Sequence, residues 1–171
     1  MSIIKTKKFI LRPFRKGDEK SLIDNINDKN ISKYMSVIPY PYTKKDADKW
    51  IKNCINQEKT KHRKEFVFAI DKNGVIGGIG FSNIDGHKAE FGYWLGRNYW
   101  GQGIIFSAAK LVLKFGFRDL KLKRIYAYAY KHNKRSIKIL KKLEFKKEGL
   151  LIKHIKKDEK FFDCYLYAKT K

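Results

Sequence analysis

Two glycines lie between an aromatic strand pattern and an apolar helical pattern, in the stretch YWGQGI at residues 99–104. Glycine is entropically costly inside regular structure, so a pair at such a junction indicates that the backbone must be bare there. A junction from strand through glycine to helix directs several backbone N–H groups, and the positive end of the helix dipole, at one point. Because this arrangement suits a phosphate, Gly101 and Gly103 are candidate residues of a diphosphate site.

The glycine loop is not specific by itself. It lacks the Gly-x4-Gly-Lys-Ser/Thr pattern of a P-loop, and Phe106 stands where a dinucleotide fingerprint requires a third glycine. A tight turn that binds no ligand explains the loop equally well.

A second polar group follows the predicted strand at 123–130. Asn133 is a natural helix N-cap, and Ser136 lies one turn into the helix that it would begin. From the residues alone, a simple cap followed by a solvated serine explains this pair.

The elements that would position these residues can be predicted from hydrophobic periodicity. The length of 171 residues fits one domain, spanning 1–171, and the alternation of elements predicts an α/β (α+β) class with a mixed sheet. Asp18 and Thr43 are predicted N-caps, the latter forming a capping box with Asp46. Strand patterns occur at 8–15, 65–71, 75–85, 88–96, 123–130 and 160–169, and helical patterns at 17–35, 43–55, 104–117 and 133–145.

The chain is strongly basic, with 40 Lys and Arg against 17 Asp and Glu and a net charge of +23. Two explanations stay open: a polyanionic partner such as nucleic acid or a ribosome, and compositional drift that spreads lysine over a solvated surface. No apolar run of about 18 residues predicts a membrane span, and charges within residues 1–14 argue against a secretory signal. Cys54 and Cys164 lack zinc-ligand spacing, so we expect a cytoplasmic protein with reduced thiols and no metal.

Five ordered segments resemble the GCN5-related N-acetyltransferase (GNAT) superfamily, and within it the branch typified by RimJ and RimL. The resemblance implies the acyl-CoA N-acyltransferase fold, in which a central, mixed and mostly antiparallel sheet carries helices on both faces. It further implies that strands 88–96 and 123–130 are parallel neighbours that splay apart, and that acetyl-CoA is the cofactor. The segments are 10–28, 39–51, 89–104, 123–149 and 161–169.

The resemblance also assigns cofactor contacts. Main-chain N–H groups of the loop would hold the pyrophosphate, although Trp100 replaces the usual Gln/Arg and Ile105 replaces a small residue. Asn133 would contact the pantetheine arm, and Tyr93 and Leu95 would contribute backbone groups. The loop residues so assigned are Trp100, Gly101, Gln102, Gly103, Ile104 and Ile105.

The catalytic positions depart from the pattern of the superfamily. Many relatives carry a tyrosine acid at the position of Leu140, so Ser136 becomes the candidate that hydrogen-bonds the leaving sulfur and also lies at the cofactor. Glu90, on the cofactor strand, is the candidate base. Its strand parity matches Gly92 and Trp94, and a salt bridge to a lysine is the alternative role.

An acetyl acceptor must present a neutral amine. Neutralising a lysine side chain at pH 7 costs about 4 to 5 kcal/mol, whereas an α-amine costs about 1 to 1.5 kcal/mol. The absence of an obvious strong base and the positive net charge favour a protein N-terminal α-amine, as on a ribosomal protein, with direct attack in a ternary complex. The alternatives are an antibiotic, polyamine or amino-acid acceptor, and a basic RNA- or ribosome-binding module without catalysis. We expect a monomer or homodimer.

Overall fold

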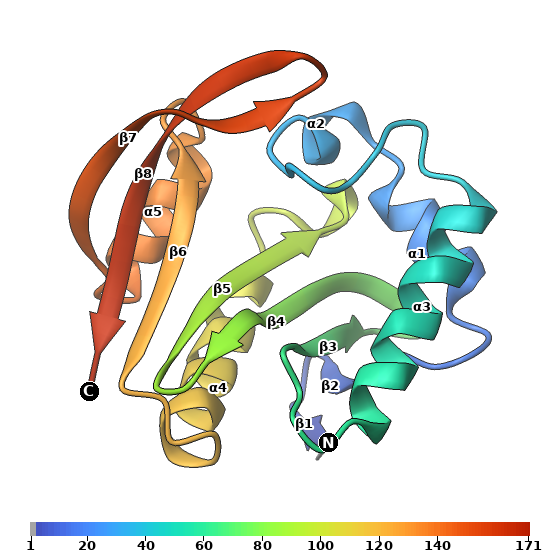
Figure 1. Ribbon diagram of the computed structural model, residues 1–171. Coiled ribbons are helices and arrows are strands. Elements are labelled where there is room, and N and C mark those ends of the chain that lie inside the picture. Colours follow the sequence, from blue (N-terminus) through green and yellow to red (C-terminus); the bar gives the residue numbers. More distant parts are fainter. Residues whose placement is uncertain (1–2) are drawn as a thin grey trace.

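A mixed eight-stranded sheet organises the computed structural model, which describes residues 3–171 (Figure 1). The strand order is β1-β2-β3-β4-β5-β6-β8-β7, and among these described strands only β5 and β6 pair in parallel. The strands are β1 (Ile4–Lys5), β2 (Ile10–Pro13), β3 (Phe66–Asp71), β4 (Val75–Asp85), β5 (Lys88–Leu95), β6 (Arg124–Tyr130), β7 (Lys146–Lys157) and β8 (Lys160–Thr170). The helices are α1 (Glu19–Ile26), α2 (Lys29–Ser32), α3 (Lys44–Lys59), α4 (Ile104–Arg118) and α5 (Lys134–Lys142), with a 3-10 turn at Arg97–Tyr99.

Helices cover both faces of the sheet, as expected. One core packs α4 and α5 against the sheet through Val112, Leu140 and their neighbours, and a second core packs α1 to α3 against the other face through Leu22 and Ile51. Side chains of β5 alternate between the two cores: Phe91 belongs to the first and Trp94 to the second. None of the helices within residues 3–171 has the length and apolar character needed to cross a lipid bilayer.

The parallel neighbours β5 and β6 separate soon after they meet, which confirms the splayed pair. Register pairs exist only between Lys88–Glu90 and Arg124–Tyr126. Beyond Glu90 the strand β5 continues beside β4, while β6 continues beside β8. The sheet is therefore divided along one line, and the two halves diverge from there (Figure 1).

The continuous helix predicted over 17–35 is wrong. The chain forms α1 and α2 instead, because two side chains interrupt the helix between them. Asn27 accepts a hydrogen bond from the distant amide of Tyr42 at 2.9 Å. Asp28 caps α2 by accepting from the amide of Asn30 at 2.6 Å. In contrast, the capping box predicted at Thr43 and Asp46 is confirmed at the start of α3.

The lysine-rich strand β7 does not appear among the predicted strands, yet it forms a long hairpin with β8. Near the hairpin tip, Lys157 donates hydrogen bonds to the carbonyl oxygens of Ser32 and Met35 at 2.6 Å and of Ile38 at 3.0 Å. Burial lowers the pKa of this lysine. The hairpin is thereby tied to the segment after α2, across the line where the sheet is divided (Figure 1).

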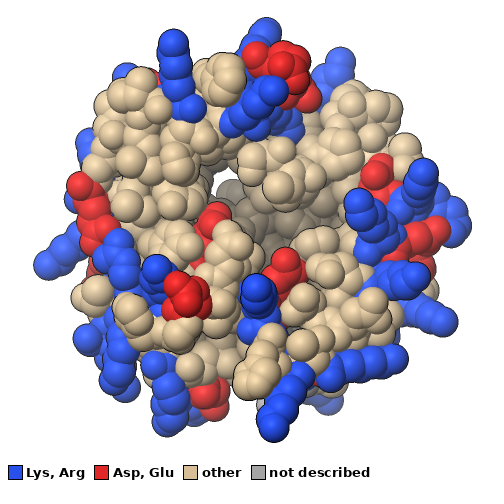
Figure 2. Space-filling model, viewed as in Figure 1, with Lys and Arg blue, Asp and Glu red and all other residues tan. Residues whose placement is uncertain are grey.

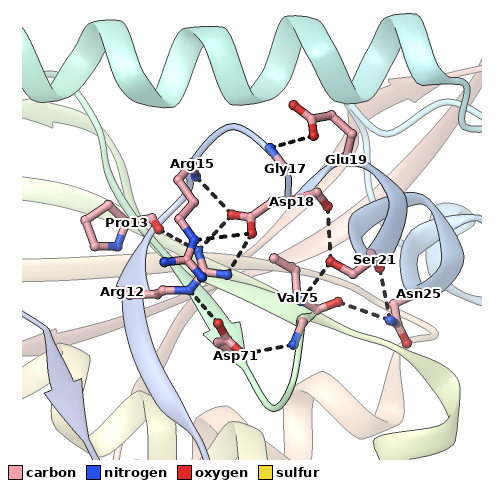
Figure 3. Close-up of polar contacts among 11 residues, drawn as sticks. Arg12, Pro13, Arg15, Gly17, Asp18, Glu19, Ser21, Asn25, Asp71 and Val75 are labelled. Atoms are coloured by element: carbon pink, nitrogen blue, oxygen red, sulfur yellow. Dashed lines mark hydrogen bonds and ion pairs between the residues drawn. The ribbon is translucent and has the colours of Figure 1, made fainter.

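A buried charge network joins β2, α1 and β3 (Figure 3). The Arg12 guanidinium donates to both carboxylate oxygens of Asp18, at 2.8 and 2.7 Å, and to Asp71. Asp18 occupies the predicted N-cap position, but its side chain does not cap the helix. Its carboxylate accepts hydrogen bonds from the Arg12 guanidinium and from the amide of Arg15 instead. Burial acts to raise the pKa of Asp71, but hydrogen bonds from Gly74 and Arg12 outweigh it and lower that pKa.

Asp18→Asn should destabilise the fold, because it leaves part of a buried guanidinium without its charge partner. Arg12 and Asp18 are only 6% and 4% exposed. Removing one member of a buried pair costs about 3 to 5 kcal/mol, and we expect about 3 kcal/mol since Asp71 still pairs with Arg12. Urea unfolding measures the loss. Asp48→Ala, which removes an exposed pair with Lys44, is the matched control and should change stability little. Equal effects of both substitutions would contradict the role of the network.

Candidate active site

The glycine loop adopts the conformation that its sequence suggests. Gly101 and Gly103 have φ angles of 78° and 73°, in the left-handed region where other residues are strained. Gly103 is the N-cap of α4 and no side chain caps that helix. A Cβ added at either glycine meets no atom within 4 Å. The loop backbone therefore borders open space beside the first amides of α4, which no side chain caps, and this arrangement fits the pyrophosphate of coenzyme A.

Two side-chain hydrogen bonds and two buried isoleucines stabilise the loop. The Trp100 indole donates to the Leu95 carbonyl at 2.8 Å, and Gln102 donates to the Asn98 carbonyl at 3.0 Å. The side chains of Ile104 and Ile105 are buried in the core, at 3% and 7% exposure. Ile104 and Ile105 can thus offer a ligand only main-chain groups, and the carbonyl of Leu95 already accepts from Trp100.

A cavity of about 350 Å³ opens beside the loop, between the ends of β5 and β6 and the segment around α2. Four of its lining residues are cationic and none is acidic, so its charge suits an anionic ligand. The Arg135 guanidinium also stacks 4.5 Å from the centre of the Trp100 ring. The lining residues are Asn30, Lys33, Tyr34, Arg97, Trp100, His132, Asn133, Lys134 and Arg135.

Ser136 and Tyr93 form a hydroxyl pair on the α5 side of β5. Asn133 caps α5 as predicted, accepting from the Ser136 amide at 3.1 Å. The Ser136 hydroxyl lies 2.9 Å from the Tyr93 hydroxyl. Burial raises the pKa of Tyr93 to about 12, against the opposing effect of the bond with Ser136, so the phenol stays protonated at neutral pH. The sequence predicted only backbone contacts for Tyr93, because nothing in it shows that two hydroxyls 43 residues apart will meet.

Glu90 lies on the opposite face of β5 from Ser136. Its carboxylate accepts from the Asn83 amide group at 2.8 Å, rather than pairing with a lysine. On the neighbouring strand β6, Tyr126 and Tyr128 project to the same face, with ring centres 5.7 Å apart. Burial first, and then the negative charge of Glu90, raise the pKa of both tyrosines.

The two predicted catalytic residues are therefore not brought together, and one lies on each side of the divided sheet. This arrangement can serve a thioester placed in the gap, with a proton acceptor on one side and a hydroxyl donor on the other. The cavity cations, His132 and Tyr34 were missed as site residues, since their positions depend on how α2 and α5 pack. Within residues 3–171, no group of three or more His, Cys, Asp or Glu side chains is arranged to hold a metal ion.

Comparison with known sequences gives one family. Residues 8–146 match the family model of the acetyltransferase (GNAT) domain. The uncharacterized N-acetyltransferase p20 of Bacillus licheniformis is 33% identical, over 100% of this chain and 97% of that protein. The spermidine N(1)-acetyltransferase of Escherichia coli K12 is 28% identical over 83% and 75%. The ribosomal protein uS5-alanine N-acetyltransferase of the same strain is 33% identical over 61% and 55%.

Solved structures share the whole fold. A GNAT acetyltransferase from Bacillus anthracis superposes with a TM-score of 0.84 at 26% identity, covering 99% of this chain and 98% of that one. The microcin C7 self-immunity acetyltransferase MccE, solved in complex with acetyl-CoA and AMP, has a TM-score of 0.83 at 26% identity over 97% and 94%.

Gly103→Glu should abolish acetyl-CoA binding, because the new side chain occupies the open space at the start of α4 and repels phosphate. Calorimetric titration with acetyl-CoA measures the loss. Gly86→Glu is the matched control, since Gly86 also has a positive φ, 54°, and open space but lies in the turn between β4 and β5. Unchanged affinity in Gly103→Glu would show that the loop is not the cofactor site.

Ser136→Ala should lower kcat about ten- to a hundredfold, as expected for the loss of one hydrogen bond worth about 1 to 3 kcal/mol in the transition state. Acetyl-CoA affinity and the melting temperature should change little, because Asn133 caps α5 through the Ser136 amide. Tyr93→Phe should have a smaller effect, and the double variant should lose less than the sum.

The pH profile of kcat should have the same shape in Tyr93→Phe and in wild type between about pH 6 and 9, because burial raises the pKa of Tyr93 to about 12.

For Ser136→Ala, a kcat equal to that of wild type would show that the serine hydroxyl takes no part in the reaction.

Proposed function

The chain belongs to the acetyltransferase (GNAT) family, and on that premise we propose that it transfers an acetyl group from acetyl-CoA to the N-terminal α-amine of an acidic protein. The observation that carries the choice of acceptor is the charge around the cavity: Lys33, Arg97, Lys134 and Arg135 line it without any carboxylate. Such a surface attracts an acidic polypeptide and repels a polycation at long range.

The net charge of +23 and one relative support the same acceptor. Lys and Arg side chains cover much of the periphery of the hollowed face (Figure 2). The relative that acetylates the alanine of ribosomal protein uS5 is 33% identical over the part that aligns. A protein acceptor therefore agrees with the charge and with one relative's named substrate.

A polyamine is the second candidate, supported by the spermidine acetyltransferase that is 28% identical over 83% of this chain. Glu90 flanked by Tyr126 and Tyr128 offers a carboxylate and two aromatic rings, a combination that binds ammonium groups. A single carboxylate suits one ammonium group, whereas a polyamine carries several, so the cationic rim weighs against it. Membership of an enzyme family disfavours the non-catalytic RNA-binding alternative.

The residues on the two faces would divide the chemistry between them. Acetyl-CoA, when bound, supplies a thioester whose carbon–sulfur bond breaks, with its electron pair going to sulfur, as the amine nitrogen bonds to the carbonyl carbon. Glu90, held by Asn83, would accept the proton that the amine loses, directly or through water. On the other face, Ser136 would donate a hydrogen bond to the leaving sulfur, and the protonated Tyr93 would hydrogen-bond to the serine hydroxyl.

The proposal is tested with a panel of candidate amine acceptors, and the release of the coenzyme A thiol measures the rate of transfer. An acidic peptide with a free α-amine should be acetylated with a kcat/KM about tenfold above that of a neutral peptide with the same first residue, and added salt should shrink this difference. An N-blocked acidic peptide that contains lysine is the control for ε-amines. Faster transfer to spermidine, or a difference that salt does not change, would contradict the proposed acceptor.

A further inference from the structure

Gly92 is a glycine that the fold itself does not require. It lies in the middle of β5, inside an eight-stranded sheet, and it is the only exposed residue of that strand. A Cβ added to it meets no atom within 4 Å, and its φ lies outside the region that favours glycine. Glycine in a strand weakens it, so a bare residue here must have another reason.

The other glycines each have a structural reason. One group has a positive φ: Gly17, Gly74, Gly86, Gly101 and Gly103. A second group has no room for a side chain, because an added Cβ would come within 2.1 to 2.7 Å of a neighbouring atom: Gly77, Gly78, Gly80, Gly96 and Gly116. Gly149 lies at the irregularity in the pairing of β7 with β8. Gly92 alone among the 12 glycines has none of these reasons.

The space over Gly92 lies on the face that carries the candidate base. Strand alternation places Gly92 on the same side as Glu90, two residues earlier, and opposite to Tyr93. Pairing of β5 with β6 ends at Glu90 and Tyr126, so Gly92 lies just beyond the point where the strands part. Tyr128 projects to this face from the other strand, and the charge of Glu90 acts on it.

We propose that Gly92 is a specificity-determining residue, bare so that the carbon bearing the acceptor amine can pass over the β5 backbone to reach the acyl group. This inference rests on the proposed transferase reaction, but it holds for any primary amine. The cofactor arm would use the gap between the strands and the α5 side, while the acceptor would use the Glu90 face. A side chain at position 92 would therefore obstruct the acceptor and leave the cofactor site intact.

The test compares Gly92→Ala and Gly92→Val with Gly149→Ala, a glycine remote from the gap whose added Cβ also meets nothing. All three variants should keep a melting temperature at or above that of wild type and bind acetyl-CoA within about twofold, because an alanine or valine at an open position with a compatible φ is tolerated. The kcat/KM for the amine should fall about tenfold in Gly92→Ala and about a hundredfold in Gly92→Val, as displacement of a reacting group by about 1 Å predicts.

The amine is whichever member of the peptide and spermidine panel the wild-type chain acetylates fastest. If that amine is spermidine, the proposed acceptor fails while the role of Gly92 is still tested. Unchanged transfer rates in both Gly92 variants, or a loss of acetyl-CoA affinity that matches the loss of rate, would overturn the inference.

Discussion

Three residue pairs join β5 to β6, and the end of that pairing at Glu90 and Tyr126 determines where the rest of the site lies. Backbone N–H and C=O groups inside a sheet need partners, and two diverging strands no longer supply them to each other. An extended, polar ligand in the gap would supply these partners, and a pantetheine arm has that character. The loop that follows β5 and the helix that follows β6 both begin at the wide end of this gap, so the glycine loop and the Asn133 cap lie beside each other.

The proposed cofactor region would depend on main-chain groups more than on side chains. The loop glycines supply conformation, α4 supplies free amides, and Ile104 and Ile105 turn their side chains into the core. This explains how Trp100 and Ile105 can depart from the family pattern without changing the geometry that a phosphate needs. The proposed acceptor face would differ, because Glu90, Tyr126 and Tyr128 would act there through their side chains.

Local sequence signals predicted much of the fold. The glycine loop, the Thr43 and Asn133 caps, the alternation of β6 and the final strand all depend on a few neighbouring residues, and the structure has each of them. The division of the sheet came from resemblance rather than from pattern, and it is confirmed. Features that depend on distant partners were missed: Asn27 binds the amide of Tyr42 and interrupts a helix, and Asp18 gives its carboxylate to Arg12.

The same limit applies to the site, because local sequence patterns do not predict which distant residues will meet. Candidate positions could be predicted along the chain, but the Tyr93–Ser136 pair and the cavity cations exist only after α5 and α2 have packed. The strand β7 was missed because its lysines conceal the alternation that marks a strand, and it pairs only with β8.

The three carbonyl groups bound by Lys157 have a topological consequence. The β5–β6 pairs close the gap at its narrow end, and the tie from the hairpin to the segment after α2 closes it at the wide end. The gap is thus bounded by protein at both ends rather than open at the edge of the sheet. A gap bounded in this way still has two faces, so a donor and an acceptor could approach it from opposite sides and neither would have to leave before the other arrives. A direct transfer between two molecules bound at once is the kinetic scheme that such a gap permits.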